Sequence, residues 1–180
     1  MCGAPTLRFS GKDRRAVCAE GGKREEGLLI RAFREQDAAA VSDILQEARE
    51  AAGWSASMVR EIFSSGRVSG YISETGGKAT GFVLGREVLD EGEILNLAVT
   101  RKNRGQGEGT ALLRKLLDSF AARGVWRIFL EVRESNLCAI AFYAKLGFQK
   151  VGRREGYYRE PTEAALILEY GTKNPQFSTE

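Results

Sequence analysis

The chain has 180 residues, a formal net charge of +3 and no histidine. This length fits one domain with a core of its own, and the small charge gives no basis for nucleic-acid binding. Without histidine, a histidine-based triad or a typical zinc site is excluded, so a general base must be carboxylate, tyrosine, lysine or water. Three cysteines lack C-x-x-C spacing, and no apolar run reaches the ~20 residues of a membrane span. A cytoplasmic protein is expected.

The two ends of the chain differ in composition from its middle. Residues 1–27 are rich in Gly, Arg, Lys and Glu without periodicity, so a poorly ordered extension is expected there. A single domain is expected over residues 28–172, followed by a frayed tail at 173–180. No internal repeat and no second domain are found in the sequence.

A strand and two helices are predicted first. Residues 28–33 have the pattern of a strand, and Asp37 is placed to cap a helix. The inner face of that helix is expected to hold Val41, Ile44, Leu45 and Ala48. Ser55 is placed to cap a second helix. Its inward side chains are expected to be Met58, Val59, Ile62 and Phe63.

A hairpin and a further strand follow. The turn at residues 75–77, Thr-Gly-Gly, joins predicted strands at 68–73 and 78–89. The chain turns again at 90–92 into a strand at 93–99. Because these strands are joined by short turns, a repeated βαβ array is disfavoured, and a mixed sheet is predicted.

A glycine-rich turn separates this strand from a helix. The helix is predicted because apolar residues recur on one face, at Leu112, Leu113, Leu116, Leu117 and Phe120. Such a turn directs unpaired N–H groups and the positive end of the helix dipole at one spot, which suits a pyrophosphate. The turn lacks the Gly-Lys-Ser/Thr of a P-loop. Its order, Arg104-x-x-Gly107-x-Gly109, also differs from the Gly-x-Gly-x-x-Gly of a dinucleotide fold.

The C-terminal half is predicted to complete the sheet. Gly124 ends the helix, and the strand at 126–132 alternates, with Ile128, Leu130 and Val132 on one face and Phe129 and Glu131 on the other. A further helix begins at Ser135 and Asn136. Its expected inner face is Leu137, Ile140, Ala141 and Ala144. A strand from residue 150, a loop with Tyr157 and Tyr158, and a strand at 164–170 follow.

Two separate motifs resemble one family. Arg104-x-x-Gly107-x-Gly109 after a strand ending in Ala-Val resembles the acetyl-CoA motif of the GCN5-related N-acetyltransferases (GNAT). The runs 130–148 and 152–158 resemble its RimI-type branch, the N-terminal alanine acetyltransferases of a small-subunit ribosomal protein. The likeness covers about residues 28–170. It implies an α/β (α+β) GNAT fold, with a mixed, mostly antiparallel sheet of six to seven strands and about four helices.

The resemblance implies acetyl-CoA as co-substrate and no metal. The pantetheine arm would pair with the backbone of Leu97, Ala98 and Val99. The turn around the pyrophosphate would comprise Arg104, Gly105, Gln106, Gly107, Glu108, Gly109 and Thr110. Asn136 would hydrogen-bond the cofactor, and it equally fits a helix N-cap.

The resemblance also implies direct acetyl transfer to a protein α-amine, with Glu131 as general base and Tyr143 as general acid. A lone, partly desolvated carboxylate beside aromatic residues has usable basicity near neutrality. A structural ion pair of Glu131, with Arg133 as partner, is the alternative, and Tyr143 also fits plain core packing. Cys138 is the only candidate nucleophile in the core and has no histidine to activate it, so no covalent intermediate is expected.

The acceptor is expected to be the N-terminus of an alanine-starting ribosomal protein, bordered by Trp54, Tyr157 and Tyr158. Packing alone would also explain these aromatic residues. Glu108 stands where an apolar residue is usual, and its side chain is expected to point outward. A lysine or small-molecule acceptor and a non-catalytic acetyl-CoA sensor remain open. A monomer or weak dimer, without nucleic acid or membrane as partner, is expected.

Overall fold

The computed structural model describes residues 27–48 and 54–171, so the expected extension and tail lie almost wholly outside it. Its strands are β1 (Leu29–Ala32), β2 (Val68–Thr75), β3 (Lys78–Val88), β4 (Glu91–Val99), β5 (Arg127–Arg133), β6 (Gln149–Arg159) and β7 (Thr162–Gly171). Its helices are α1 (Ala38–Glu47), α2 (Ala56–Ser64), α3 (Glu108–Ala122) and α4 (Leu137–Lys145), with 3-10 turns η1 (Glu35–Asp37) and η2 (Arg101–Asn103). None of these helices is long and apolar enough to span a membrane.

The seven strands form one sheet in the order β1-β2-β3-β4-β5-β7-β6. Among the pairs of described strands, β4–β5 is parallel and the others are antiparallel. The predicted mixed, mostly antiparallel sheet is therefore confirmed. The two-residue turn of the β2–β3 hairpin has both glycines, Gly76 and Gly77, at positive φ, which matches the twist of the strands that it joins.

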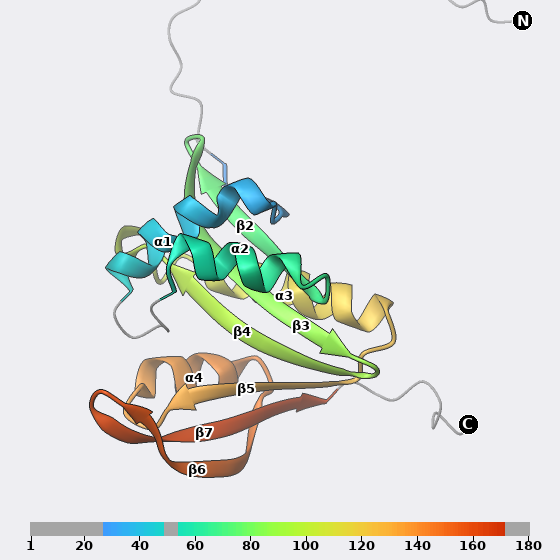
Figure 1. Cartoon of the computed structure of the whole chain (residues 1–180), viewed down its shortest axis with the longest axis vertical. Helices are drawn as coiled ribbons and strands as arrows, with labels where there is room; N and C mark the ends of the chain where they lie inside the picture. The colour runs from blue at the N-terminus through green and yellow to red at the C-terminus, as the bar shows by residue number, and fades with distance from the viewer. Residues whose placement is uncertain (1–26, 49–53, 172–180) are drawn as a thin grey trace, which may run out of the picture.

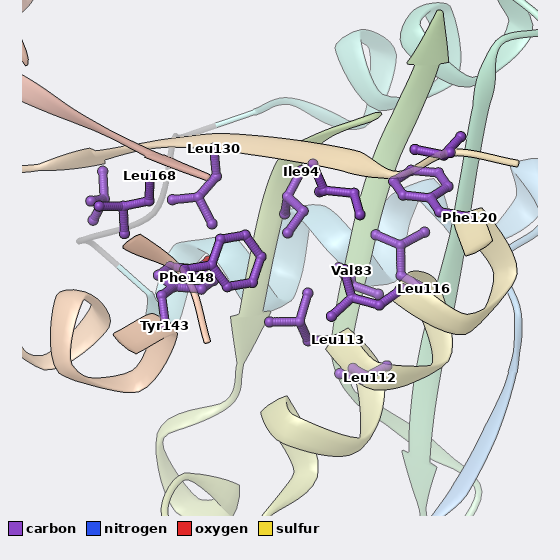
Figure 2. Close-up of a cluster of buried hydrophobic side chains, with 14 of the residues drawn as sticks. Val83, Ile94, Leu112, Leu113, Leu116, Phe120, Leu130, Tyr143, Phe148 and Leu168 are labelled. Atoms are coloured by element: carbon purple, nitrogen blue, oxygen red, sulfur yellow. The ribbon is translucent and has the colours of Figure 1, made fainter. Parts of the chain in front are cut away.

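Helices cover both faces of the sheet, with α1 and α2 in front of β2, β3 and β4 and α3 behind them (Figure 1). One apolar cluster joins α1 and α2 to side chains such as Ile72, Phe82 and Leu84. The second cluster joins α3 and α4 to Val83, Leu130 and their neighbours (Figure 2). The five predicted inward side chains of α3 are all buried. The buried face of α3 that sequence periodicity predicts is therefore confirmed.

The strands β4 and β5 meet at their starts and then diverge, as Figure 1 shows. Their register covers only Glu91–Glu93 against Arg127–Phe129. Beyond this point β4 stays paired with β3 up to Val99, while β5 pairs with β7 up to Arg133. One extra residue of β4, Leu95, interrupts the β3–β4 register. The second half of β4 therefore keeps one backbone edge without a partner strand among the described residues.

The predicted inner face of α4 is wrong for three of its four residues, and only Ile140 packs against the core cluster. Leu137 is 72% exposed, and Ala141 and Ala144 are also exposed. Tyr143 is buried instead, with Phe142 and other apolar neighbours packed against the same cluster. Because α4 is apolar around almost its whole circumference, sequence periodicity could not select its buried face. In α2, Met58 is likewise 45% exposed rather than inward.

The two predicted helix caps have different outcomes. The Ser55 hydroxyl accepts a hydrogen bond from the Met58 amide at 3.3 Å, so the cap of α2 is confirmed. Asp37 precedes α1, but its carboxylate accepts the Arg34 amide at 2.8 Å and pairs with Arg31 at 2.7 Å. Asp37 therefore stabilises η1 and β1 rather than the first turn of α1.

Candidate active site

The N-terminus of α3 presents free backbone donors. Gly107 is its N-cap, with φ 84°, and no side chain caps the helix. The first intrahelical hydrogen bond runs from the Ala111 amide to the Gly107 carbonyl at 3.0 Å. The amides of the preceding three residues therefore have no acceptor inside the helix. Together with the helix dipole, they form an environment suited to an anion.

The turn before α3 is basic and tied to the end of β4. Arg104 donates from Nε to the Val99 carbonyl at 3.1 Å, and Gln106 donates to the Lys102 carbonyl at 2.9 Å. A Cβ added to Gly105 or Gly107 would meet no atom within 4 Å, so the space above the turn is open. Exposed Arg101 and Lys102 add positive charge beside it.

The expectation that Glu108 points outward is wrong. Its side chain is buried, with the residue 3% exposed, and Oε1 accepts the Ser73 hydroxyl at 2.5 Å and the Thr80 hydroxyl at 2.7 Å. A Cβ at Gly81 would lie 2.8 Å from this oxygen, so glycine is needed there. The carboxylate fits inside because β2 and β3 supply hydroxyl donors that lie far from it in the sequence.

Glu131 lies in the middle of β5, on the face opposite Leu130 and Val132. Its side chain is 19% exposed, and Oε1 pairs with Arg154 Nη1 at 2.6 Å. The expectation of a lone carboxylate is therefore wrong, and the partner is not Arg133. Arg133 pairs with Glu163 at 3.2 Å instead.

Tyr157 and Tyr158 belong to strand β6, not to the predicted loop. The β6–β7 register shifts between Arg154 and Tyr158, so Tyr157 lies in a bulge. A hydrogen bond to Glu131 raises the pKa of the Tyr157 hydroxyl. Burial, with the nearby charge of Glu131, raises the pKa of Tyr158. The structure thus brings both tyrosines to the Glu131 carboxylate.

Tyr143 reaches the same region from α4. Its ring packs against Phe142 at a centroid distance of 5.1 Å. It also packs against Phe148 at 5.4 Å (Figure 2). Burial raises the pKa of the Tyr143 hydroxyl, and the nearby Tyr158 adds to this effect. Tyr143 belongs to the cluster on the Leu130 face of β5, whereas Glu131 lies on the other face. The two groups therefore approach the diverging strands from opposite sides of the sheet.

A cleft of about 430 Å³ lies on the Glu131 face. Residues of β3, β4, β5, β6 and β7 line it, among them Arg86, Glu93, Glu131, Arg154 and Tyr157. Arg86 and Glu93 form a second ion pair there at 2.6 Å. The cleft is therefore open, polar and partly aromatic.

The remaining predicted site residues have structural partners. The Asn136 side chain accepts the Ala139 amide at 3.1 Å, so it caps α4 and leaves its NH₂ group for another contact. Trp54 packs against the α1–α2 cluster and is not among the described residues that line the cleft. Cys138 is exposed rather than in the core. No cluster of three or more possible metal ligands occurs in residues 27–48 and 54–171.

Residues 38–148, more than half of the chain, match the Acetyltransferase (GNAT) family. The chain belongs to this family. An uncharacterized N-acetyltransferase of Methanocaldococcus jannaschii is 33% identical to this GNAT protein over 142 residues, which are 78% of this chain and 90% of that relative.

Other relatives of this GNAT protein carry a more specific name. The [Ribosomal protein bS18]-alanine N-acetyltransferase of Escherichia coli (strain K12) is 43% identical over 94 residues, which are 51% of this chain and 64%, less than two thirds, of that relative. The crystal structure of the ribosomal-protein-S18-alanine N-acetyltransferase from Escherichia coli has a TM-score of 0.70 at 34% identity and covers 81% of this chain and 94% of that chain. The predicted resemblance to the RimI-type branch is confirmed.

Sequence reasoning missed three residues of this GNAT site: Arg154, Ser73 and Thr80. Arg154 stands in a run of charged residues, and nothing in that run distinguishes it from Arg153. Ser73 and Thr80 alternate with apolar residues in strands, which is the pattern of an ordinary half-buried sheet. An acidic residue at 108 was the one available signal, because a buried carboxylate requires donors nearby.

Proposed function

We propose that this GNAT protein transfers the acetyl group of acetyl-CoA to the N-terminal α-amine of a protein, an alanine-starting ribosomal protein. The observation that carries the proposal is the Glu131 carboxylate in an open cleft beside Tyr157 and Tyr158. The named activity of the bS18-alanine N-acetyltransferase relatives supports the same acceptor.

The chain has residues that fit acetyl-CoA. The uncapped amides at the start of α3 and the open space over Gly105 and Gly107 fit its pyrophosphate. The edge of β4 at Leu97–Val99 fits the pantetheine arm as an added strand, and the Asn136 NH₂ group is a further donor. When bound, acetyl-CoA supplies the acetyl group as an activated thioester.

In this proposal Glu131 accepts a proton from the acceptor amine, directly or through one water. A carboxylate is a weak base, so the acceptor must itself be partly neutral. An α-amine has a pKa near 7.7–8.0 and meets this condition, whereas a lysine near ~10.4 does not. The site is therefore better suited to an N-terminus than to a lysine side chain.

Tyr143 is the proposed acid. Because burial raises its pKa, its hydroxyl keeps the proton at neutral pH. The reference pKa of a thiol, about 8.5, is lower than that of tyrosine, about 10, so full transfer to a thiolate is uphill. Burial increases this difference. Tyr143 is therefore expected to assist departure of the thiolate mainly through a hydrogen bond.

The test is acetylation of a peptide panel, with the modified atom located by mass spectrometry. Ala-, Ser- and Met-starting peptides, each with an internal lysine, are incubated with acetyl-CoA. Acetylation is expected on the α-amine of the Ala-starting peptides. Glu131→Gln is expected to lower kcat/KM by about 10²-fold or more, as removal of a general base does.

The matched control is Glu134→Gln, because Glu134 is a neighbouring glutamate that pairs with Arg153 at 2.6 Å and does not line the cleft. It is expected to stay within about two-fold of wild type, since exposed ion pairs contribute little. Acetylation of the internal lysine would support acetyltransferase activity but contradict the proposed α-amine acceptor. Binding of acetyl-CoA without any transfer would favour the sensor.

A further inference from the structure

The proposed base is not free in this structure. The Glu131 carboxylate pairs with Arg154 at 2.6 Å and accepts a hydrogen bond from Tyr157. Both partners come from β6, whereas β3 and β4 line the other side of the cleft. We propose that Arg154 is a positioning residue that occupies the Glu131 carboxylate until the ammonium group of the acceptor takes its place. This inference rests on the proposed function, in which Glu131 receives the acceptor amine.

The two members of the ion pair differ in how freely they can move. The Arg154 side chain is 56% exposed, whereas that of Glu131 is 19% exposed. Water can therefore solvate the guanidinium group as soon as it leaves, and separation costs little on its side. Glu131 is fixed in the middle of a paired strand. Arg154 is the partner that yields to an incoming cation.

The backbone next to Arg154 supports such a movement. Between Arg154 and Tyr158, β6 advances four residues while β7 advances two, so this part of β6 bulges from the sheet. Gly156 lies in the bulge with φ 57°. The Arg154 guanidinium also lies 5.6 Å from the centroid of the Tyr157 ring, which offers a second contact for the cation.

The other arginines near the carboxylate in the described part of the chain pair with different groups. Arg133 pairs with Glu163 and also donates to the Glu160 carbonyl at 3.2 Å. Arg86 pairs with Glu93 on the far wall of the cleft. Each is held by its own acceptor. Occupation of Glu131 by a cation therefore depends on Arg154 or on the ligand.

The replacement of Arg154 by the ammonium group of the acceptor, here called the exchange, also selects the acceptor. An α-amine arrives partly as an ammonium ion, so it replaces one cation with another and leaves no unpaired carboxylate in the cleft. A ligand end without charge offers no such replacement and leaves the ion pair intact. The structure thus predicts a preference for cationic chain ends that arises from competition with Arg154.

The experiment compares two ligands on the CoA-loaded protein. One is an Ala-starting peptide, and the other is the same peptide with its α-amine replaced by hydrogen. In Arg154→Gln, the Kd and KM of the amine-bearing peptide are expected to fall about two- to five-fold, the range for removal of one exposed ion pair. The Kd of the desamino peptide is expected to stay at the wild-type value, because that ligand does not compete for Glu131.

Arg153→Gln is the matched control, since Arg153 precedes Arg154 in the same strand and pairs with Glu134. It is expected to change neither affinity. An equal change for both ligands, or a weaker binding of the amine-bearing peptide, would overturn the exchange. If the exchange is seen but no peptide is acetylated, only the proposed function fails. A wild-type protein that binds neither peptide would overturn both.

Discussion

The buried Glu108 carboxylate connects the first turn of α3 to β2 and β3. It accepts hydrogen bonds from Ser73 and Thr80, and Gly81 leaves the space that it occupies. A buried hydroxyl that loses its acceptor retains the full cost of its desolvation. The position of the proposed anion-binding turn thus depends on two hydroxyl groups that lie about 30 residues earlier in the chain.

Glu108→Leu is therefore expected to lower the free energy of unfolding by about 1–3 kcal/mol, because it leaves both hydroxyl groups without an acceptor. Urea denaturation measures this change. Glu108→Gln keeps an acceptor oxygen and is expected to lose less. Adding Ser73→Ala and Thr80→Val to Glu108→Leu is expected to recover part of the loss. A Glu108→Leu variant as stable as wild type would show that the hydrogen bonds of Glu108 with Ser73 and Thr80 do not stabilise the fold.

At the scale of elements, the short helix α4 contributes two residues to the proposed site, Asn136 at its start and Tyr143 on its buried face. Its N-cap, Asn136, fixes the start of the helix, and its buried face carries Tyr143 to the proposed site. The β4–β5 divergence leaves one backbone edge in the second half of β4 without a partner strand among the described residues. The cap and the proposed cofactor contact use different atoms of Asn136, because the cap uses only the carbonyl oxygen.

Substitutions at Asn136 separate these two roles. Asn136→Ala is expected to lower the free energy of unfolding by about 1 kcal/mol through loss of the cap. Asn136→Asp retains a capping oxygen but loses the NH₂ group, so we expect near-wild-type stability with weaker binding of CoA. Thermal unfolding and calorimetric titration with CoA check the two effects. Unchanged CoA affinity in Asn136→Asp would leave the residue with the capping role alone.

At the scale of the whole molecule, an ion-pair network joins the N-terminal part of the sheet. Arg31 in β1 pairs with Asp37 in η1 at 2.7 Å and with Glu74 in β2 at 2.6 Å. Burial raises the pKa of Asp37, but the hydrogen bonds from Arg31 and from the Arg34 backbone together outweigh burial and lower it. The network is therefore strongest when Asp37 is ionised.

This lowered pKa predicts a loss of stability in acid. A carboxyl group whose pKa is lower in the folded state stabilises the fold above its unfolded pKa, near ~3.9, and this contribution is lost as the pH falls through the folded pKa. The free energy of unfolding is thus expected to decline below about pH 4. Asp37→Asn is expected to be less stable at pH 7 and to show a smaller decline. Asp43→Asn, at an exposed position of α1, is the control and is expected to follow wild type. An equal decline in Asp37→Asn would contradict this assignment.

Local chemistry in the sequence determined most of the elements and the strand–glycine–helix part of the candidate site. Patterns within short stretches of sequence predict the inward face of α3 and the alternation in β5. Local turn and cap chemistry predicts the hairpin at Gly76 and Gly77 and the Ser55 cap. Periodicity and turn chemistry act over this range, so a sequence can reveal them. The proposed anion-binding turn could be located in the same way, because strand, glycines and helix are contiguous in the sequence.

Only the tertiary structure decided the contacts that join distant segments. Glu108 turns inward because Ser73 and Thr80 come from other strands. Glu131 pairs with Arg154, because β7 places β6 and β5 on its two sides. The α4 helix is apolar on almost all sides, so its sequence does not show which side is buried. Its packing against β5 and β7 decides this. In each case the pairing depends on strand order and register, and these are set by the burial of the whole sheet rather than by any local run of residues.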